Sequence, residues 1–198
     1  MGKPLESMDK ILDFGCGWGR VSRCFLREVS AGRLIGCDCI PDMVKLCNDT
    51  IKDYRFIRND PLPPLQFDDN TFDLLYAFSV FSHLSEAAHK AWLREFYRVM
   101  KPGSILILTT RPRDFISYWP KLPYIQNINA EKFLEDYDHG KYVHIPASGG
   151  DTLSESFYGE TAIPETYILR EWSQWFDINQ FLDYVPHVDQ KVIIAMRV

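Results

Sequence analysis

The sequence predicts an α/β fold in which helices cover both faces of a mostly parallel, seven-stranded sheet, with an antiparallel hairpin at the C-terminus. Over residues 9–110, short and almost continuously apolar runs alternate with segments of helical periodicity. Strands of that kind are buried on both faces, as in a parallel sheet between two layers of helices. The last two expected strands, near residues 177–185 and at 191–198, are separated only by a turn at 186–190. Because a parallel crossover needs about a dozen residues or more, these two strands are predicted to pair antiparallel.

Five of the seven strands are expected in the first 110 residues. Each is a short run of mostly apolar residues that ends at glycine, at proline or in a polar cluster. They are expected at residues 10–14, 33–37, 54–57, 72–78 and 104–110. Helical segments separate most of these runs, so the strands are predicted to lie parallel to one another.

The helices between these strands are predicted from capping residues and apolar stripes. One helix is expected over residues 19–30, and the next begins at Pro41, a residue that suits the first helical position. A third helix is capped by Ser85, with Glu86 in its positive first turn. Its apolar stripe predicts the side chains that face the core, namely Ala88, Trp92, Leu93, Phe96 and Val99. His89 lies outside this stripe and is expected on the exposed side of the helix.

Residues 111–163 interrupt the alternation, and we interpret them as a substrate-side insert in a single domain that spans residues 1–198. The segment is rich in Pro, Tyr, Trp, His and Gly. Its expected elements are a helix at 129–138, capped by Asn129, and a small hairpin of residues 141–146 with 155–160. A further helix is expected from Pro164 through Trp175.

Composition narrows the class of protein. The chain has 198 residues and a net charge of -5, so it is long enough for one core and has no excess of positive charge for a nucleic-acid partner. Its five cysteines lie within the first 47 residues without zinc-site spacing, so we expect reduced thiols and no metal site. The polar N-terminus lacks a signal-peptide core, and no apolar run approaches membrane-spanning length. We therefore expect a cytoplasmic protein that does not contact a membrane.

A glycine-rich loop after the first strand is the strongest sign of a ligand site. The run Asp13-Phe-Gly-Cys-Gly-Trp-Gly19 follows a strand and opens a helix, where exposed amide groups and small residues admit a ligand. Asp38 ends the next strand at a distance that suits ribose hydroxyls. Dinucleotide enzymes favour a third glycine at the position that Arg20 occupies and have no need of an acid at Asp13. A cofactor with a methionine ammonium group would use that acid, so the loop favours S-adenosylmethionine.

The ordered motifs resemble those of class I S-adenosylmethionine-dependent methyltransferases over roughly residues 10–110. The segment Ile11-Leu-Asp-Phe-Gly-Cys-Gly-Trp-Gly-Arg20 is similar to their first motif, and Cys37-Asp-Cys-Ile-Pro-Asp-Met43 to their second. Phe67-Asp-Asp-Asn-Thr-Phe-Asp-Leu-Leu-Tyr76 resembles the approach to their fourth strand, and Arg98-Val-Met-Lys-Pro-Gly103 the segment before their fifth. The segment Phe78-Ser-Val-Phe-Ser-His-Leu84 is more loosely similar to bacterial enzymes that act on small or sugar-like acceptors. The resemblance implies a Rossmann-like three-layer sandwich.

The resemblance also implies which residues bind S-adenosylmethionine. Asp13 and the loop residues Gly15, Cys16, Gly17 and Gly19 would lie along its methionine portion. Asp38 would bind the ribose diol, Cys39 or Ile40 would line the adenine, and Asn59 or Asp60 would meet the adenine amino group. Phe78 and Ser79 would offer main-chain atoms to the methionine amine. The family usually has one or more helices before the first strand that close over the cofactor, so a partner or a missing N-terminal segment is a possible cover for an otherwise open site.

His83 is the candidate general base, since it follows the fourth strand where cofactor and substrate should meet. His144 is a second candidate, with a structural sheet histidine as the alternative. Four aromatic residues could form the wall of an acceptor pocket or could pack in a core: Trp119, Tyr124, Tyr142 and Tyr158. Glu155 and Glu160 could bind a hydroxyl or amine of the acceptor, or could be solvated charges.

The favoured function is therefore methyl transfer from S-adenosylmethionine to a small-molecule acceptor, with oxygen slightly preferred as the acceptor atom because of His83. A non-catalytic cofactor-binding or partner module with the same fold is the alternative. An NAD(P)-dependent oxidoreductase is a further alternative that Arg20 and Asp13 disfavour.

Overall fold

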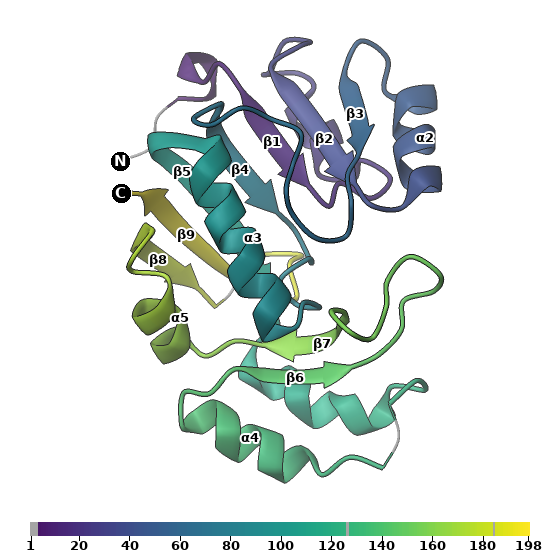
Figure 1. The fold of residues 1–198 in the computed structure, drawn as a ribbon, viewed down its shortest axis with the longest axis vertical. Coiled ribbons are helices and arrows are strands. Elements are labelled where there is room, and N and C mark those ends of the chain that lie inside the picture. Colours follow the sequence, from purple (N-terminus) through teal and green to yellow (C-terminus); the bar gives the residue numbers. More distant parts are fainter. Residues whose placement is uncertain (1–3, 126, 184) are drawn as a thin grey trace.

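The fold is a seven-stranded sheet with helices on both faces, and it confirms the predicted class (Figure 1). The computed structural model describes residues 4–125, 127–183 and 185–198. Strand order is β3-β2-β1-β4-β5-β9-β8, in which β9 runs antiparallel to both β5 and β8 and the remaining pairs are parallel. The strands of the sheet are β1 (Ile11–Phe14), β2 (Leu34–Asp38), β3 (Arg55–Arg58), β4 (Phe72–Ala77), β5 (Met100–Thr110), β8 (Phe176–Leu182) and β9 (Lys191–Arg197).

The remaining elements are mostly short and lie around this sheet. The α-helices are α1 (Ser22–Phe25), α2 (Pro41–Thr50), α3 (Glu86–Val99), α4 (Ala130–Asp138) and α5 (Glu165–Glu171), and the 3-10 helices are η1 (Leu5–Ser7) and η2 (Arg113–Lys121). Two more strands, β6 (Val143–Pro146) and β7 (Gly159–Ala162), form a separate antiparallel pair. Among the described residues, no helix is long and apolar enough to cross a membrane.

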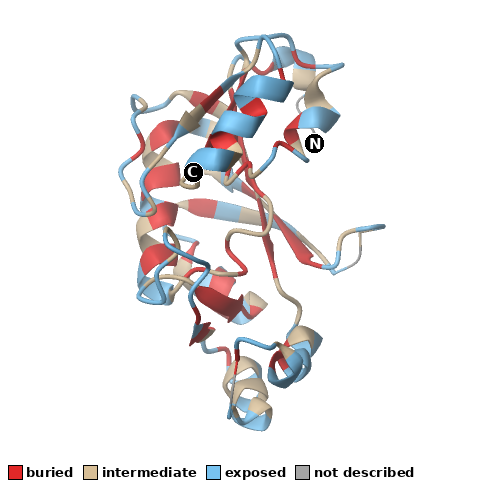
Figure 2. Ribbon diagram, turned by 90° about the vertical axis from the view of Figure 1, so that its right-hand side faces the viewer, coloured by how far each residue is buried: buried red, intermediate tan, exposed pale blue. Residues whose placement is uncertain are grey.

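Alternation along β1 shows how the sheet separates two cores. Leu12 and Phe14 pack into a large cluster with α3 and α5, whereas Ile11 packs on the opposite face with Met8 and Val29. Because neighbouring side chains of a strand point to opposite faces, the two clusters lie on the two sides of the sheet. Figure 2 shows buried residues running along the strands between them. The three-layer arrangement thus follows directly from strands that are apolar on both faces.

The first predicted helix is much shorter than expected. Residues 19–30 were expected to be helical throughout, but the α-helix covers only Ser22–Phe25, with turns on either side. Gly19 has a positive φ of 81°, a conformation outside the right-handed helical region, so the helix cannot start there. No side chain caps its N-terminus, since the N-cap residue is Val21, which cannot accept a first-turn N–H.

Other element boundaries shift by a few residues. The strand expected at 104–110 begins at Met100, because Met100 already pairs with Phe72 before an irregularity in the ladder. The helix expected through Trp175 ends at Glu171, where the chain turns and the N–H of Phe176 bonds to the carbonyl of Trp172 as β8 begins. Ser85 caps α3 as predicted, accepting from the N–H of Ala88.

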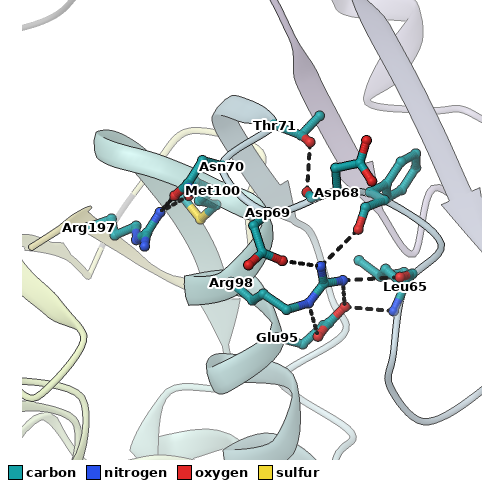
Figure 3. Close-up of polar contacts among 10 residues, drawn as sticks. Leu65, Asp68, Asp69, Asn70, Thr71, Glu95, Arg98, Met100 and Arg197 are labelled. Atoms are coloured by element: carbon teal, nitrogen blue, oxygen red, sulfur yellow. Dashed lines mark hydrogen bonds and ion pairs between the residues drawn. The ribbon is translucent and has the colours of Figure 1, made fainter.

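An arginine on α3 fixes the connection between β3 and β4 (Figure 3). The guanidinium of Arg98 donates to the carbonyl oxygens of Leu65 and Phe67 and pairs with the carboxylates of Glu95 and Asp69. Glu95 in turn accepts from the N–H of Leu65 at 2.7 Å. Charge-assisted bonds of this kind are about twice as strong as neutral ones. Residues 65–69 of the long connection that follows β3 are therefore held against α3.

The insert forms a small core of its own. Its buried residues are Ile116, Trp119, Ile125, Val143, Ile145 and Ala162. Asn129 caps α4 by accepting from the N–H of Glu131, as predicted. The hairpin partner of residues 143–146 is residues 159–162, a few residues later than the expected 155–160. The segment 147–158 is left as a long connection that reaches back toward the carboxyl ends of β1, β2 and β4 (Figure 1).

Candidate active site

Two neighbouring cavities lie at the carboxyl edge of the parallel strands, where strand order reverses between β1 and β4. Open α/β sheets bind ligands at such a point. Each cavity has a volume of about 160 Å³. Gly15, Phe78 and Ser79 line both cavities. Asp38, Cys39, Ile40 and Asn59 line the first, and Asp13, Cys16 and Gly17 the second.

All the predicted cofactor-binding residues except Gly19 and Asp60 therefore line one of these two cavities. Gly19 has a packing role instead, since a Cβ built on it would lie 2.6 Å from Cδ1 of Ile51. Gly15 is required at the cavity itself. It has a φ of 70°, and an added Cβ would lie 2.4 Å from Cγ2 of Val80.

Asp38 connects the glycine loop to the end of β2. Its Oδ2 accepts from the N–H of Gly17 at 2.8 Å, and its Oδ1 accepts from the N–H of Ile40 at 2.9 Å. The carboxylate is buried, yet two oxygens offer about four lone-pair positions in all. Two main-chain bonds therefore orient the group and leave it able to accept from further donors in the cavity.

Asn59 and Asp60 are distinguished by their surroundings. Asn59 lines the first cavity, whereas Asp60 does not. The side-chain Nδ2 of Asn59 donates to the main-chain oxygen of Asp60 at 2.7 Å, which orients the amide. Its Oδ1 is buried and has no hydrogen-bond partner within the described part of the chain. An acceptor atom of this kind in a cavity wall is suited to a ligand that carries an N–H donor.

Asp13 is an almost fully buried acid that lines the second cavity. Burial raises its pKa from the usual 3.8 to about 6, although a hydrogen bond from the Ser22 hydroxyl opposes the shift. Arg20 lines the same cavity, and its guanidinium lies over the ring of Phe78, 4.6 Å from the centroid. The second cavity thus offers an acidic and a basic side chain to a ligand that carries both charges.

Ser79 adopts a strained main-chain conformation between the two cavities. Its φ is 61°, a region that costs a residue other than glycine about 1–3 kcal/mol. The N–H of Ser79 donates to the hydroxyl of Thr109 at 2.8 Å, and its Oγ accepts from Nε2 of Gln190, also at 2.8 Å. Thr109 donates to Oε1 of Gln190 at 2.6 Å. This closed set of bonds ties the end of β4 to β5 and to the turn before β9.

His83 lies where the turn after β4 meets β7. Its Nδ1 is 2.8 Å from the carbonyl oxygen of Gly159 and 3.5 Å from Oε1 of Glu160. A carbonyl oxygen can only accept, so Nδ1 carries the proton of the neutral ring and Nε2 carries its lone pair. Burial lowers the pKa of His83, and the nearby charge of Glu160 opposes this. The ring is stacked on Tyr158, with centroids 5.0 Å apart.

A third cavity, of about 200 Å³, adjoins the first. His83, Tyr124, Tyr158 and Glu160 line it together with main chain of the 147–149 segment. Tyr158 also lines the first cavity, so the two share a wall. Glu160 is buried, whereas Glu155 is exposed and outside the cavity.

Three of the other candidates lie outside this cavity. Trp119 is fully buried in the core of the insert. The hydroxyl of Tyr142 donates to the carbonyl of Leu84 at 2.8 Å, and its ring packs against the main core. His144 pairs through Nδ1 with Thr161 at 2.8 Å, and burial lowers its pKa to about 4. These three residues have packing or sheet contacts instead of a place in the cavity wall.

The expectation of an exposed His89 was wrong. The side chain is fully buried, because α5 and the insert cover the side of α3 on which it lies. Its Nε2 accepts from the indole N–H of Trp172 at 2.8 Å, and its Nδ1 is 3.2 Å from the hydroxyl of Tyr142. Burial lowers its pKa to about 3, so the ring is neutral. His89 is a structural residue that joins α3, α5 and the insert.

Residues 11–103 match the family model described as a methyltransferase domain. A demethylmenaquinone methyltransferase from Lactiplantibacillus plantarum is 34% identical over 109 residues, which are 52% of this chain and 45% of that protein. The solved structure of an S-adenosylmethionine dependent methyltransferase from Mesorhizobium loti has a TM-score of 0.69 at 16% identity, covering 99% of this chain and 94% of that one. Residues 11–103 thus match a methyltransferase domain, and the chain as a whole has the fold of S-adenosylmethionine-dependent methyltransferases. This domain and this fold imply S-adenosylmethionine as the cofactor.

A relative of broader coverage acts on another class of molecule. A tRNA (carboxymethyluridine(34)-5-O)-methyltransferase from Arabidopsis thaliana is 26% identical over 171 residues, 83% of this chain and 38% of that protein. The chain spans less than half the length of either curated relative. The resemblance found over residues 10–110 is confirmed by the methyltransferase-domain match at residues 11–103 and by the fold.

Sequence reasoning missed several residues of these cavities. Leu153 and Phe157 line the first cavity, so the connection before β7 covers part of the carboxyl edge of the sheet, where the cofactor is expected. Gln190, which holds Ser79, belongs to the turn before β9. No local pattern marks these positions, because each reaches the site through a long-range contact. In the sequence, Arg20 was used only as an argument against a dinucleotide site. Its position directly after Gly19 could have indicated that it lines the second cavity.

Proposed function

We propose that this chain transfers the methyl group of S-adenosylmethionine to a small-molecule acceptor, with oxygen as the acceptor atom. The observation that carries the proposal is the pair of cavities at the carboxyl edge, with an oriented carboxylate at Asp38 and an unpartnered amide oxygen at Asn59. A ribose diol donates two hydrogen bonds, and an adenine amino group donates one more, so the acceptors present match the donors of the cofactor.

The second cavity fits the methionine portion. Arg20 would pair with its carboxylate, and Asp13 would accept from its ammonium group directly or through water. A bound ammonium would also lower the pKa of Asp13 toward its usual value, because an opposite charge favours the ionised acid. When bound, the cofactor supplies an electrophilic methyl group on a sulfonium sulfur.

In this proposal the protein contributes alignment and a base. Tightly held strand ends place the acceptor in line with the methyl group, and proximity of this kind can contribute about 7–11 kcal/mol in favourable cases. His83 would accept the hydroxyl proton at Nε2, since the carbonyl of Gly159 orients Nδ1 as the donor. The lowered pKa keeps the ring neutral at physiological pH, the form that a base requires.

A small molecule is the favoured acceptor because the third cavity is only about 200 Å³ and the net charge of the chain is -5. The relatives' names include both a quinone-type acceptor and a tRNA. A cytoplasmic location remains our inference, supported by five unpaired cysteines. The alternative of a non-catalytic binding module is kept because cofactor binding alone would require the same two cavities.

Calorimetry of cofactor binding tests the proposal. Asp38→Ala should weaken the affinity for S-adenosylhomocysteine by about 1.5–3 kcal/mol, or roughly 10- to 150-fold, because charge-assisted ribose bonds are lost. Asp177→Ala, which changes an exposed aspartate on β8, is the matched control and should leave the affinity unchanged. Equal affinities for the two variants would refute the site. Incubation with labelled S-adenosylmethionine and mixed acceptors then separates an enzyme from a binding module, since the module transfers no label.

A further inference from the structure

The wall of the third cavity includes a buried carboxylate, Glu160, that lines neither of the two cavities at the sheet edge. Glu160 lies on β7 and is only 3% exposed. Its Oε1 accepts from the hydroxyl of Tyr124 at 2.9 Å and faces Nδ1 of His83 at 3.5 Å. Its Oε2 is buried and, within residues 4–125, 127–183 and 185–198, has no hydrogen-bond partner.

An unpartnered carboxylate oxygen in such a place is costly. A buried polar group without a partner costs about 1–3 kcal/mol, and more when it is charged. The chain keeps this group beside a cavity of about 200 Å³ instead of turning it to solvent. A ligand donor that reaches Oε2 would remove this cost, so the cavity is suited to a molecule with a donor at that point.

The surroundings favour a neutral donor over a charged one. An anionic ligand would be repelled by Glu160 itself. A cationic ligand would be disfavoured by the positive charge of Arg111, which lies outside the cavity lining but close enough to oppose protonation of His83. Tyr124 already donates to the carboxylate and spreads part of its negative charge. A hydroxyl group can donate a hydrogen bond to Oε2 of Glu160 without adding a charge beside His83 and Arg111.

His83 gives the cavity a second acceptor. Its Nδ1 donates to the carbonyl of Gly159, so its Nε2 is the lone-pair atom of the ring. His83 and Glu160 both line the third cavity, and Oε1 of Glu160 lies 3.5 Å from Nδ1 of His83. Two acceptor side chains that are neighbours in one cavity wall suit two neighbouring hydroxyl groups of one ligand.

We propose that the third cavity is the acceptor site and that it takes a small molecule with two neighbouring hydroxyl groups, as in a catechol or a vicinal diol. One hydroxyl donates to Oε2 of Glu160 and stays unmethylated. The oxygen of the other forms the new bond to the methyl carbon while the carbon–sulfur bond breaks and its electron pair stays on sulfur. The proton of that hydroxyl passes to Nε2 of His83 and then to water. This inference rests on the proposed function, because it assumes that the methyl donor occupies the adjoining cavities.

Ligand-observed NMR with the full chain and saturating S-adenosylhomocysteine tests the inference, using catechol, 2-methoxyphenol and benzylamine as probes. Catechol should bind best, since 2-methoxyphenol lacks one donor and benzylamine carries a positive charge. Glu160→Gln should weaken catechol binding at least about tenfold, because the amide cannot replace the anionic acceptor. Glu155→Gln, which changes the exposed glutamate of the same insert, should bind catechol as the wild type does.

Calorimetry with S-adenosylhomocysteine separates this inference from the proposed function. Glu160→Gln should bind S-adenosylhomocysteine as the wild type does, which also shows that the variant is folded. If the wild type binds S-adenosylhomocysteine but binds no catechol, or if Glu160→Gln binds catechol equally well, the acceptor assignment is overturned and the proposed function stands. Tighter binding of benzylamine than of catechol overturns the choice of a neutral ligand. If the wild type does not bind S-adenosylhomocysteine, the proposed function itself fails.

Discussion

The carboxyl edge of the parallel sheet and the insert form their cavities in different ways. At the sheet edge, most of the residues that line the cavities lie at or just after the ends of the parallel strands β1 to β4. In the insert, long polar side chains from separate segments meet around one buried carboxylate. The edge site therefore depends on strand geometry that many sequences can supply. The insert site depends on individual side chains, and this is where specificity for an acceptor can vary without disturbing the cofactor edge.

Loss of the large aromatic residue in the core of the insert tests whether the two regions are separable. Trp119 is fully buried and meets the ring of Phe133 edge-on, with centroids 5.5 Å apart. Trp119→Ala should lower the free energy of unfolding by about 3–5 kcal/mol, measured by urea denaturation. Tyr118→Ala, which changes the exposed neighbour, should stay within about 0.5 kcal/mol of the wild type.

The same variant should still bind S-adenosylhomocysteine under conditions in which it is folded. Its affinity should fall less than that of Asp38→Ala, since most of the cofactor edge belongs to the sheet. An equal or larger loss of affinity in Trp119→Ala would show that the insert and the edge act as one unit. In that case the contrast between the two regions would not hold.

Asp13, the buried acid of the second cavity, is expected to lower the stability of the chain while strengthening cofactor binding. Asp13 has its pKa raised from 3.8 to about 6 in the folded chain, so the folded state binds more protons than the unfolded state between these values. The free energy of unfolding therefore falls as pH rises from about 4 to 6, and the loss is complete above pH 6. Asp13→Asn removes it and should stabilise the chain by about 3 kcal/mol at pH 7.5, with little effect below pH 4.

Urea denaturation at pH 7.5 and pH 4 measures this difference, and calorimetry measures the accompanying change in affinity. The variant should bind S-adenosylhomocysteine more weakly, because the neutral amide cannot pair with the methionine ammonium. Asp177→Asn, on the exposed edge of β8, should show neither effect. A destabilised Asp13→Asn at pH 7.5 would mean that the Ser22 bond outweighs the cost of burying the charge.

The difference between the two regions also explains how far the sequence could be interpreted. Runs that are apolar on both faces are typical of strands in a sheet covered by helices on both sides. Since Gly15, Asp38 and Ser79 end or follow such strands, they lie together at the carboxyl edge of the sheet. The choice between Asn59 and Asp60 could not be made in this way. It depends on which side chain turns into the cavity, and this is set by the bond from Asn59 to the main chain of Asp60.

The insert follows no such periodicity, and its contacts cross long stretches of chain. Glu160 becomes a cavity residue only because β7 bonds to the segment after β4, where the N–H of Gly159 meets the carbonyl of His83. His89 is buried for a similar reason, since Trp172 lies against it from a distant part of the chain. Helical periodicity describes one helix at a time and cannot show which of its faces another segment will cover.

The smallest predicted effect lies where the C-terminal hairpin meets the cofactor edge. Gln190 is nearly buried and bonds to both Ser79 and Thr109, outside the residues that match the family model. Gln190→Ala should lower the free energy of unfolding by about 1–2 kcal/mol, because two hydrogen bonds are lost. It should also weaken S-adenosylhomocysteine binding severalfold in calorimetry, since the strained main chain of Ser79 loses its support.

Gln190→Glu separates the two bonds, because a carboxylate still accepts from Thr109 but cannot donate to Ser79. If Gln190→Glu binds as tightly as the wild type while Gln190→Ala does not, the support comes through Thr109 and not through the strained serine.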